Sequence, residues 1–91
     1  MGKRTEFSGH ARMRMQERGT TDAEVIEAIE YGKREPAQRG LVQYRHNVEY
    51  NNTWAGRDYA IKQVMPVVAI EEDRLVVVTV YAFFFQEEES R

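Results

Sequence analysis

The feature that most constrains the fold of this chain is its longest apolar run, LVVVTVYAFFF at residues 75–85. The run is too short to cross a membrane as a helix, which takes about 20 apolar residues. Its β-branched and aromatic side chains favour a strand. Because few polar residues alternate with the apolar ones, the strand should be central and covered on at least one face. The sequence therefore predicts a sheet built around residues 75–85.

Two short helices are predicted ahead of this sheet. Ser8 has the chemistry of an N-cap and Gly19 that of a C-cap, which bounds the first helix at about residues 9–18. Thr21 and Glu24 have the spacing of a capping box, and Gly32 ends the second helix at about residue 31. The turn between them is very short, so the two helices should form a helical hairpin.

One apolar stripe on the helices should face the sheet. In the second helix, Val25, Ile26 and Ile29 recur at helical spacing. In the first helix, Ala11 and Met15 are the only apolar pair that could face a core. We expect these side chains to pack against the last strand, through alternate positions Val76, Val78 and Val80 or through their alternate-face neighbours.

Between the helices and the last strand, the sequence favours further strands. Residues 41–50 and 59–65 alternate loosely, and the intervening NNTWAGRD has the composition of a turn or loop. Pro66 has no N–H to donate, so it marks an edge, a bulge or a strand break before VVAI resumes the strand. The charged EEDR is a hairpin turn. The predicted fold class is α+β, with an N-terminal helical hairpin packed on an antiparallel sheet of three or four strands.

Length and composition indicate one globular domain. The chain has 91 residues, of which 42% are hydrophobic and 31% charged, a balance typical of an ordered domain. We expect residues 1–91 to form a single domain, with 1–7 and 86–91 flexible. There is no cysteine, which excludes disulfides and thiolate metal sites and makes a reducing cytoplasm the simplest location. No apolar run suits a membrane, so no membrane contact is expected.

The net charge of −2 conceals an alternation along the chain. Residues 1–20 and 33–62 each carry a net charge of +3, whereas residues 21–32 and 71–91 each carry −4. Net charge therefore gives no reason to expect nonspecific binding to nucleic acid. A local basic surface would form if the two basic segments met in space.

The first helix carries an unusual line of side chains, His10, Arg14 and Arg18, at positions i, i+4 and i+8. On a helical wheel they follow one border of the apolar side. The arginine fork matches phosphate oxygens, and histidine exchanges a proton near neutral pH, so this line can be a phosphate site. The alternative is structural: His10 would support the helix start, and Arg18 would cap helix carbonyls or pair with a glutamate of the second helix.

This pattern resembles a family of small bacterial domains of unknown function. Its signature is H-A-x-x-R-x-x-x-R-G, then an acidic helix that ends in glycine, then a closing strand with T-V-Y. The matching positions are His10, Ala11, Arg14, Arg18, Gly19, Gly32, Thr79, Val80 and Tyr81. The resemblance covers most of the chain, with residues 37–58 matching poorly. Thr20 stands where that family usually has Ile or Val, which weakens a core contact.

That family in turn is similar to the barnase–EndoU–colicin–RelE group of ribonuclease-like folds, whose members are often toxins of toxin–antitoxin pairs. The resemblance implies metal-independent RNA cleavage without a cofactor. A base activates a ribose 2′-hydroxyl, an acid protonates the leaving oxygen, and basic groups hold the phosphate. By this resemblance, His10 is the proton-transfer residue, and Arg14 and Arg18 hold the phosphate.

Tyr81 and His46 are supporting candidates for the same site. Tyr81 can donate from its phenol, or it can pack in the core with its hydroxyl at the rim. His46 shares a strand face with Tyr44 and can complete an acid–base pair with His10, or it can be a surface residue. The two histidines lack a third ligand at suitable spacing, so no metal site is expected. Trp54, in the predicted loop, can stack on a base or pack within its own loop.

The sequence thus predicts a ribonuclease-like toxin domain with RNA as substrate and an antitoxin protein as partner. The alternative is a noncatalytic protein-interaction module on the same fold, which would bind through its sheet edge or acidic tail. The last strand also predicts an interface, because a chain this short cannot easily cover both of its faces. We expect a homodimer or an antitoxin complex to cover one or more of the rings of Phe83, Phe84 and Phe85.

Overall fold

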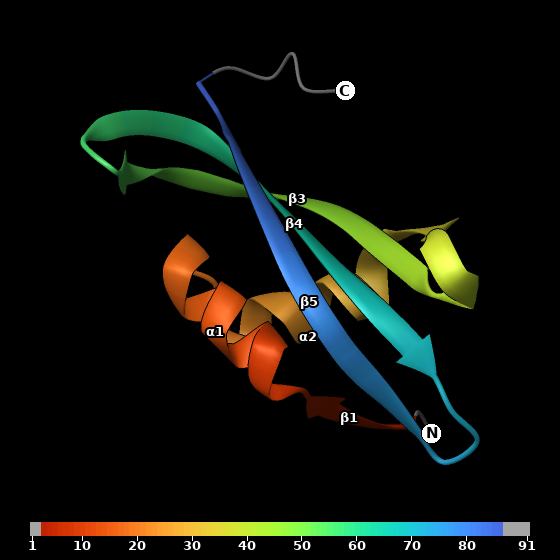
Figure 1. The fold of residues 1–91 in the computed structure, drawn as a ribbon. Coiled ribbons are helices and arrows are strands. Elements are labelled where there is room, and N and C mark those ends of the chain that lie inside the picture. The colour runs from red at the N-terminus through yellow and green to blue at the C-terminus, as the bar shows by residue number, and fades with distance from the viewer. Residues whose placement is uncertain (1–2, 87–91) are drawn as a thin grey trace.

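The computed structural model describes residues 3–86, which form two helices and one five-stranded sheet (Figure 1). The α+β class and both predicted helix ranges are confirmed. The elements in chain order are β1 (Arg4–Phe7), α1 (Gly9–Arg18), α2 (Asp22–Tyr31), β2 (Lys33–Pro36), a 3-10 turn η1 (Gln38–Gly40), β3 (Val42–Trp54), β4 (Arg57–Ile70) and β5 (Arg74–Phe85). Within residues 3–86, no helix has the length and apolar character needed to span a membrane.

Local capping fixes the two helices where the sequence predicts them. The Ser8 hydroxyl accepts a hydrogen bond from the Ala11 N–H at 3.0 Å, and Gly19 ends α1 with a left-handed φ of 65°. Thr21 and Glu24 form both bonds of the capping box, at 3.0 and 3.2 Å. These bonds satisfy backbone groups that a helix end otherwise leaves unpaired.

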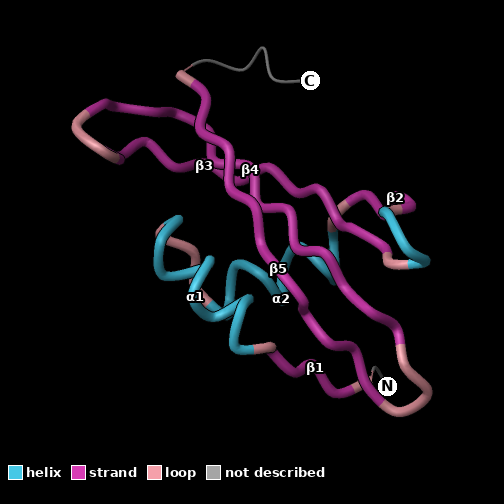
Figure 2. The backbone as a smooth tube through the Cα atoms, in the orientation of Figure 1, coloured by secondary structure: helices cyan, strands magenta, loops and turns pink. Residues whose placement is uncertain are grey.

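The sheet has five strands in the order β1-β5-β4-β3-β2 and is mixed (Figure 2). The prediction of a purely antiparallel sheet of three or four strands is therefore wrong in both strand number and direction. β1 runs parallel to β5, from Arg4 opposite Arg74 to Phe7 opposite Val77. The N-terminal residues expected to be flexible thus include a strand over 4–7, whereas 87–91 lie outside the described residues.

β3 and β4 form one long hairpin, which corrects two further expectations. The loop predicted at NNTWAGRD shrinks to Ala55 and Gly56, whose φ values of 54° and 83° make a tight turn. The fourth strand expected after Pro66 is the continuation of β4, which runs unbroken through that residue. β4 tolerates the proline beside a bulge, where the register with β5 shifts between Val67 and Val68.

The core lies between the two helices and one face of the sheet. From the helices it takes Ala11, Met15, Val25 and Ala28, and from the strands it takes Tyr44, Val64, Val68, Val77 and Val80. Val77 and Val80 both face the helices because the register shift leaves Val78 as an extra residue between them. The expected role of Ile26 is wrong, because its side chain is 44% exposed.

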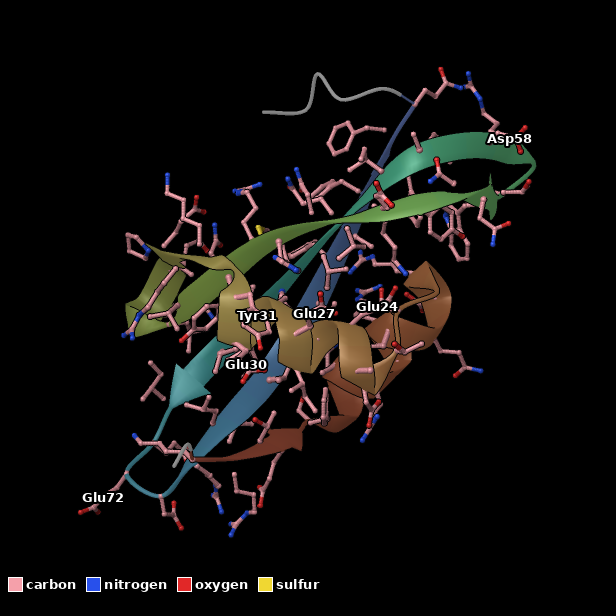
Figure 3. The ribbon with its side chains drawn as sticks, turned by 180° about the vertical axis from the view of Figure 1, so that it is seen from behind. Glu24, Glu27, Glu30, Tyr31, Asp58 and Glu72 are labelled. Carbon is pink, nitrogen blue, oxygen red and sulfur yellow. The ribbon has the colours of Figure 1, made fainter. Side chains whose placement is uncertain are left out.

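The helices cover only one face of the sheet. Figure 3 views the molecule from the helix side, with α2 in front of the strands, and Figure 1 views the opposite side. β4 alternates strictly, so Val64 and Val68 point to the helices, and Gln63, Met65 and Val67 point to the opposite face. We call that opposite side the helix-free face.

Candidate functional site

α1 lies along the part of β5 that β1 leaves uncovered. β1 pairs with β5 only as far as Val77, and α1 attaches to the strand carbonyls that follow. The Ser8 hydroxyl donates to the Val78 carbonyl at 3.3 Å, and Arg18 donates to the Val80 carbonyl at 2.7 Å. This attachment sets α1 beside the outer border of β5 (Figure 1). We call this border the α1–β5 edge.

His10 and Arg14 lie on this edge and contact each other. The Arg14 Nε donates to the His10 Nε2 at 3.4 Å, and a second Arg14 nitrogen donates to the Glu17 carboxylate at 2.8 Å. The pair therefore places an imidazole and a guanidinium side by side at the surface.

Arg18 and Tyr81 continue the same edge. Besides its bond to the Val80 carbonyl, the Arg18 guanidinium lies 5.0 Å from the centre of the Tyr81 ring. This bond answers the question left open by the sequence, since the partner of Arg18 is a strand carbonyl rather than a helix carbonyl or a glutamate. Tyr81 is 39% exposed, so its ring is a surface ring and not a core one. The edge thus carries two contacting pairs, His10 with Arg14 and Arg18 with Tyr81.

His46 lies elsewhere. It is on β3, separated from β5 by β4, and its Nε2 is 3.2 Å from the carboxylate of Glu27 on α2. As the alternation predicts, His46 shares its face with Tyr44, which lies in the core. The structure does not bring His46 to the α1–β5 edge.

Trp54 packs within the domain. Its ring stacks on Phe84 at 5.2 Å with an interplanar angle of 12°, and Tyr50 and Tyr59 surround the same phenylalanine. The ring therefore packs on β5 and not within its own loop, as one of the two alternatives had it. Phe84, one of the three rings expected at an interface, is thereby largely covered by its own chain.

A buried lysine that the sequence analysis missed lies under this cluster. Lys62 is only 2% exposed, and its ammonium donates to the Gly19 carbonyl at 2.6 Å and to the Glu24 carboxylate at 2.8 Å. These bonds tie the β3–β4 hairpin to the turn between α1 and α2. A lysine in an alternating strand is normally a surface residue, so the local sequence pattern did not predict that Lys62 is buried and bonded to the helices.

The helix-free face carries a second polar group of residues that the sequence analysis missed. Arg45 donates to Glu35 at 3.2 Å and to Gln63 at 2.9 Å, and Gln63 donates to Asn47 at 2.7 Å. Hydrogen bonds from Gln43 and Arg45 lower the pKa of Glu35 below its ordinary value of 4.5. The residues lie on three neighbouring strands, which is why no sequence spacing reveals them.

Two hollows open on the helix-free face. One, of about 660 Å³, is lined by Gln43, Thr79 and Tyr81 and by Arg39 of η1, among others. The other, of about 610 Å³, is lined by Arg45, Asn47, Gln63, Phe83 and Phe85 together with Lys33 and Glu35. Neighbouring outward residues of β5, Tyr81 and Phe83, therefore belong to different hollows.

The family described as Domain of unknown function (DUF4258) matches residues 7–82 of the chain. The chain belongs to this family. The DUF4258 match includes α1, α2, β2, β3 and β4 and extends into β5 as far as Ala82. It thus contains all four residues of the α1–β5 edge, whereas most of β1 precedes it.

No curated protein and no solved structure gives a significant match to this DUF4258 domain. Over residues 3–86, no three side chains of the His, Cys, Asp or Glu type gather in a way that could hold a metal ion. What the α1–β5 edge offers chemically is one proton acceptor, two guanidinium groups and one phenol.

Proposed function

We propose that this DUF4258 domain is a ribonuclease-like domain that cleaves RNA at the α1–β5 edge. The observation that carries the proposal is the continuity of the edge. The Arg14 Nε lies 3.4 Å from the His10 Nε2, and one helical turn further Arg18 lies 5.0 Å from the Tyr81 ring. A proton acceptor, two phosphate-binding forks and a phenol are the groups that transesterification of RNA needs.

The chemistry assigns one role to each side chain. When Arg14 turns from His10 to the phosphate, the freed lone pair on His10 Nε2 takes the proton of a ribose 2′-hydroxyl, and the resulting oxygen attacks the adjacent phosphorus. The bond from phosphorus to the 5′-oxygen breaks, and that oxygen takes a proton from the Tyr81 phenol. Arg14 and Arg18 hold the phosphate oxygens while negative charge builds on them. The products are a 2′,3′-cyclic phosphate and a free 5′-hydroxyl.

The distribution of charge supports RNA at this edge rather than on the outside of the helix layer. α2 carries Glu27 and Glu30 exposed on the outside of the helix layer (Figure 3), where they would repel a phosphate backbone. The α1–β5 edge carries Arg14 and Arg18 instead. A polyanion is therefore attracted to the edge and repelled from α2.

We assign the domain to the toxin side of a toxin–antitoxin pair, on the strength of its helix motif and of the bare border of β5. A noncatalytic interaction module is the second candidate, and the same border favours it. α1 covers this border at Val78 and Val80. Beyond them, residues 81–85 contain no charged side chain, and within the described chain no strand pairs with their outer border. Such a border accepts a partner strand readily.

The test of the proposed function is cleavage by the purified domain on a mixed RNA pool in the presence of EDTA. The His10→Ala variant should lose at least about 100-fold in rate, because it lacks the base. It should keep its RNA affinity and its melting temperature, since His10 is an exposed helix residue.

His46→Ala is the matched control and should cleave within about twofold of the unmodified domain, because His46 contacts Glu27 and not the edge. Expression without a partner gene should slow growth for the unmodified chain and not for His10→Ala. The proposal fails if the unmodified domain neither cuts RNA nor slows growth. Unfolding of His10→Ala would instead make His10 a structural residue.

A further inference from the structure

We propose that the helix-free face is a platform that stacks the unpaired bases of single-stranded RNA. The proposal rests on the proposed function and names the form of its substrate. β5 presents three aromatic rings on this face at every second position, Tyr81, Phe83 and Phe85. The Tyr81 and Phe83 side chains are 39% and 40% exposed. Their planes lie within 11° of each other, with centroids 6.4 Å apart.

Exposed, nearly parallel rings on a strand are poor core residues and good partners for bases. Stacking of a base on an aromatic ring strengthens single-strand binding and tolerates any sequence, because every base has a flat face. A duplex buries these base faces within its own stack, so the rings select unpaired RNA.

Polar groups beside the rings are held in position to meet the edges of stacked bases. The hollow that Phe83 and Phe85 line also contains Arg45, Gln63 and Asn47. Gln63 is buried, and its bonds to Arg45 at 2.9 Å and to Asn47 at 2.7 Å hold those two more exposed side chains in position. Amide and guanidinium groups fixed in this way lose little freedom when they bind a base.

Charge on both sides of the platform suits a phosphate backbone. Arg18 lies at the β5 side, over Tyr81, and Lys33 and Arg39 line the two hollows at the β2 side. The one acidic side chain among the lining residues, Glu35, already accepts bonds from Arg45 and Gln43. The two basic segments of the sequence thus flank the helix-free face from opposite sides.

The test measures binding of a fluorescent 12-nucleotide RNA by anisotropy, with the His10→Ala change in every protein so that the RNA stays intact. Phe83→Ala should weaken binding about 10-fold, and Phe83→Trp should bind within about threefold of the parent. Tyr31→Ala removes an exposed aromatic ring from α2 and should leave the affinity unchanged. The same sequence as an RNA duplex should bind at least about 10-fold more weakly than the single strand.

The outcomes separate this proposal from the proposed function. Equal binding by Phe83→Ala and its parent overturns the platform while cleavage by the unmodified domain still stands. If the unmodified domain does not cleave RNA but Phe83→Ala weakens binding, the platform stands and the proposed ribonuclease function fails. Equal binding of a DNA 12-mer overturns the assignment to RNA. If Phe83→Ala instead dissociates a dimer and leaves RNA affinity unchanged, the helix-free face is a protein interface and the proposal is overturned.

Discussion

Thr20 illustrates how much one side chain can cost this fold. It is buried, and its hydroxyl has no hydrogen-bond partner within the described residues. A buried hydroxyl without a partner has lost its hydrogen bonds to water and has formed none in the protein, which lowers the free energy of unfolding. We expect Thr20→Val to raise the free energy of unfolding by about 1 kcal/mol, which for a domain of this size raises the melting temperature by about 4–8 °C. Circular dichroism melts measure this directly.

The neighbouring Thr21 provides the control for that prediction. Its hydroxyl accepts the Glu24 N–H at 3.2 Å and caps α2. Thr21→Val should therefore lower stability by about 1 kcal/mol, the opposite sign from Thr20→Val. If both valine variants shift the melting temperature in the same direction, the hydrogen bonding of each hydroxyl does not determine the change in stability.

At the residue scale, the sequence predicted side chains on a helix better than side chains on strands. Helical spacing alone placed His10, Arg14 and Arg18 on one line, because residues four apart lie on one face. The same reasoning could not find Lys62 or Gln63. Their partners come from elements that are remote in sequence, so only the folded sheet brings them together.

At the element scale, the turn between α1 and α2 depends on the packing of Trp54. Gly19 has a φ of 65°, and a Cβ there would lie 2.5 Å from the Trp54 ring. Gly56, with a φ of 83°, has open space around it. Alanine at Gly56 should cost about 1–2 kcal/mol from backbone strain alone, and alanine at Gly19 should cost more because the ring must also move.

Urea unfolding of both alanine variants measures this difference. The excess cost of Gly19→Ala should disappear when Trp54 is also replaced by alanine, since the ring is then gone. If Gly19→Ala still costs more stability than Gly56→Ala after Trp54 is replaced, the extra cost arises in α1 and not from contact with the tryptophan.

Elements set by local bonds were predictable, and elements set by distant pairing were not. Both helices have caps within a few residues of their ends, and the prediction of their ranges is confirmed. β1 and β2 are four-residue strands with mostly polar side chains, RTEF and KREP, so neither shows an apolar alternation. They become strands because β5 and β3 offer them backbone partners.

At the scale of the whole molecule, α1 is basic and α2 is acidic, and the salt dependence of binding tests whether RNA contacts α1. Binding of single-stranded RNA weakens with salt in proportion to the number of phosphates neutralised, by about 0.7 in log–log slope for each. Arg14→Ala should therefore reduce the slope by about 0.7 between about 50 and 200 mM salt.

Arg12→Ala is the matched control for this slope. Arg12 is on the same helix but pairs with Asp22 and lies 4.2 Å from the Phe7 ring. Its loss should leave the salt dependence unchanged. Equal slopes for the Arg14 variant and the unmodified domain would mean that the α1–β5 edge touches no phosphate.

The parallel pairing of β1 with β5 has a consequence for synthesis of the protein. The helical hairpin forms from local contacts, but its strand partner, β5, is translated about 70 residues after β1. The carbonyl that holds Arg18 and the ring of Tyr81 both belong to that last strand. A nascent chain therefore lacks the α1–β5 edge until β5 leaves the ribosome. Under the proposed function, the RNA of its own translation is not cleaved before then.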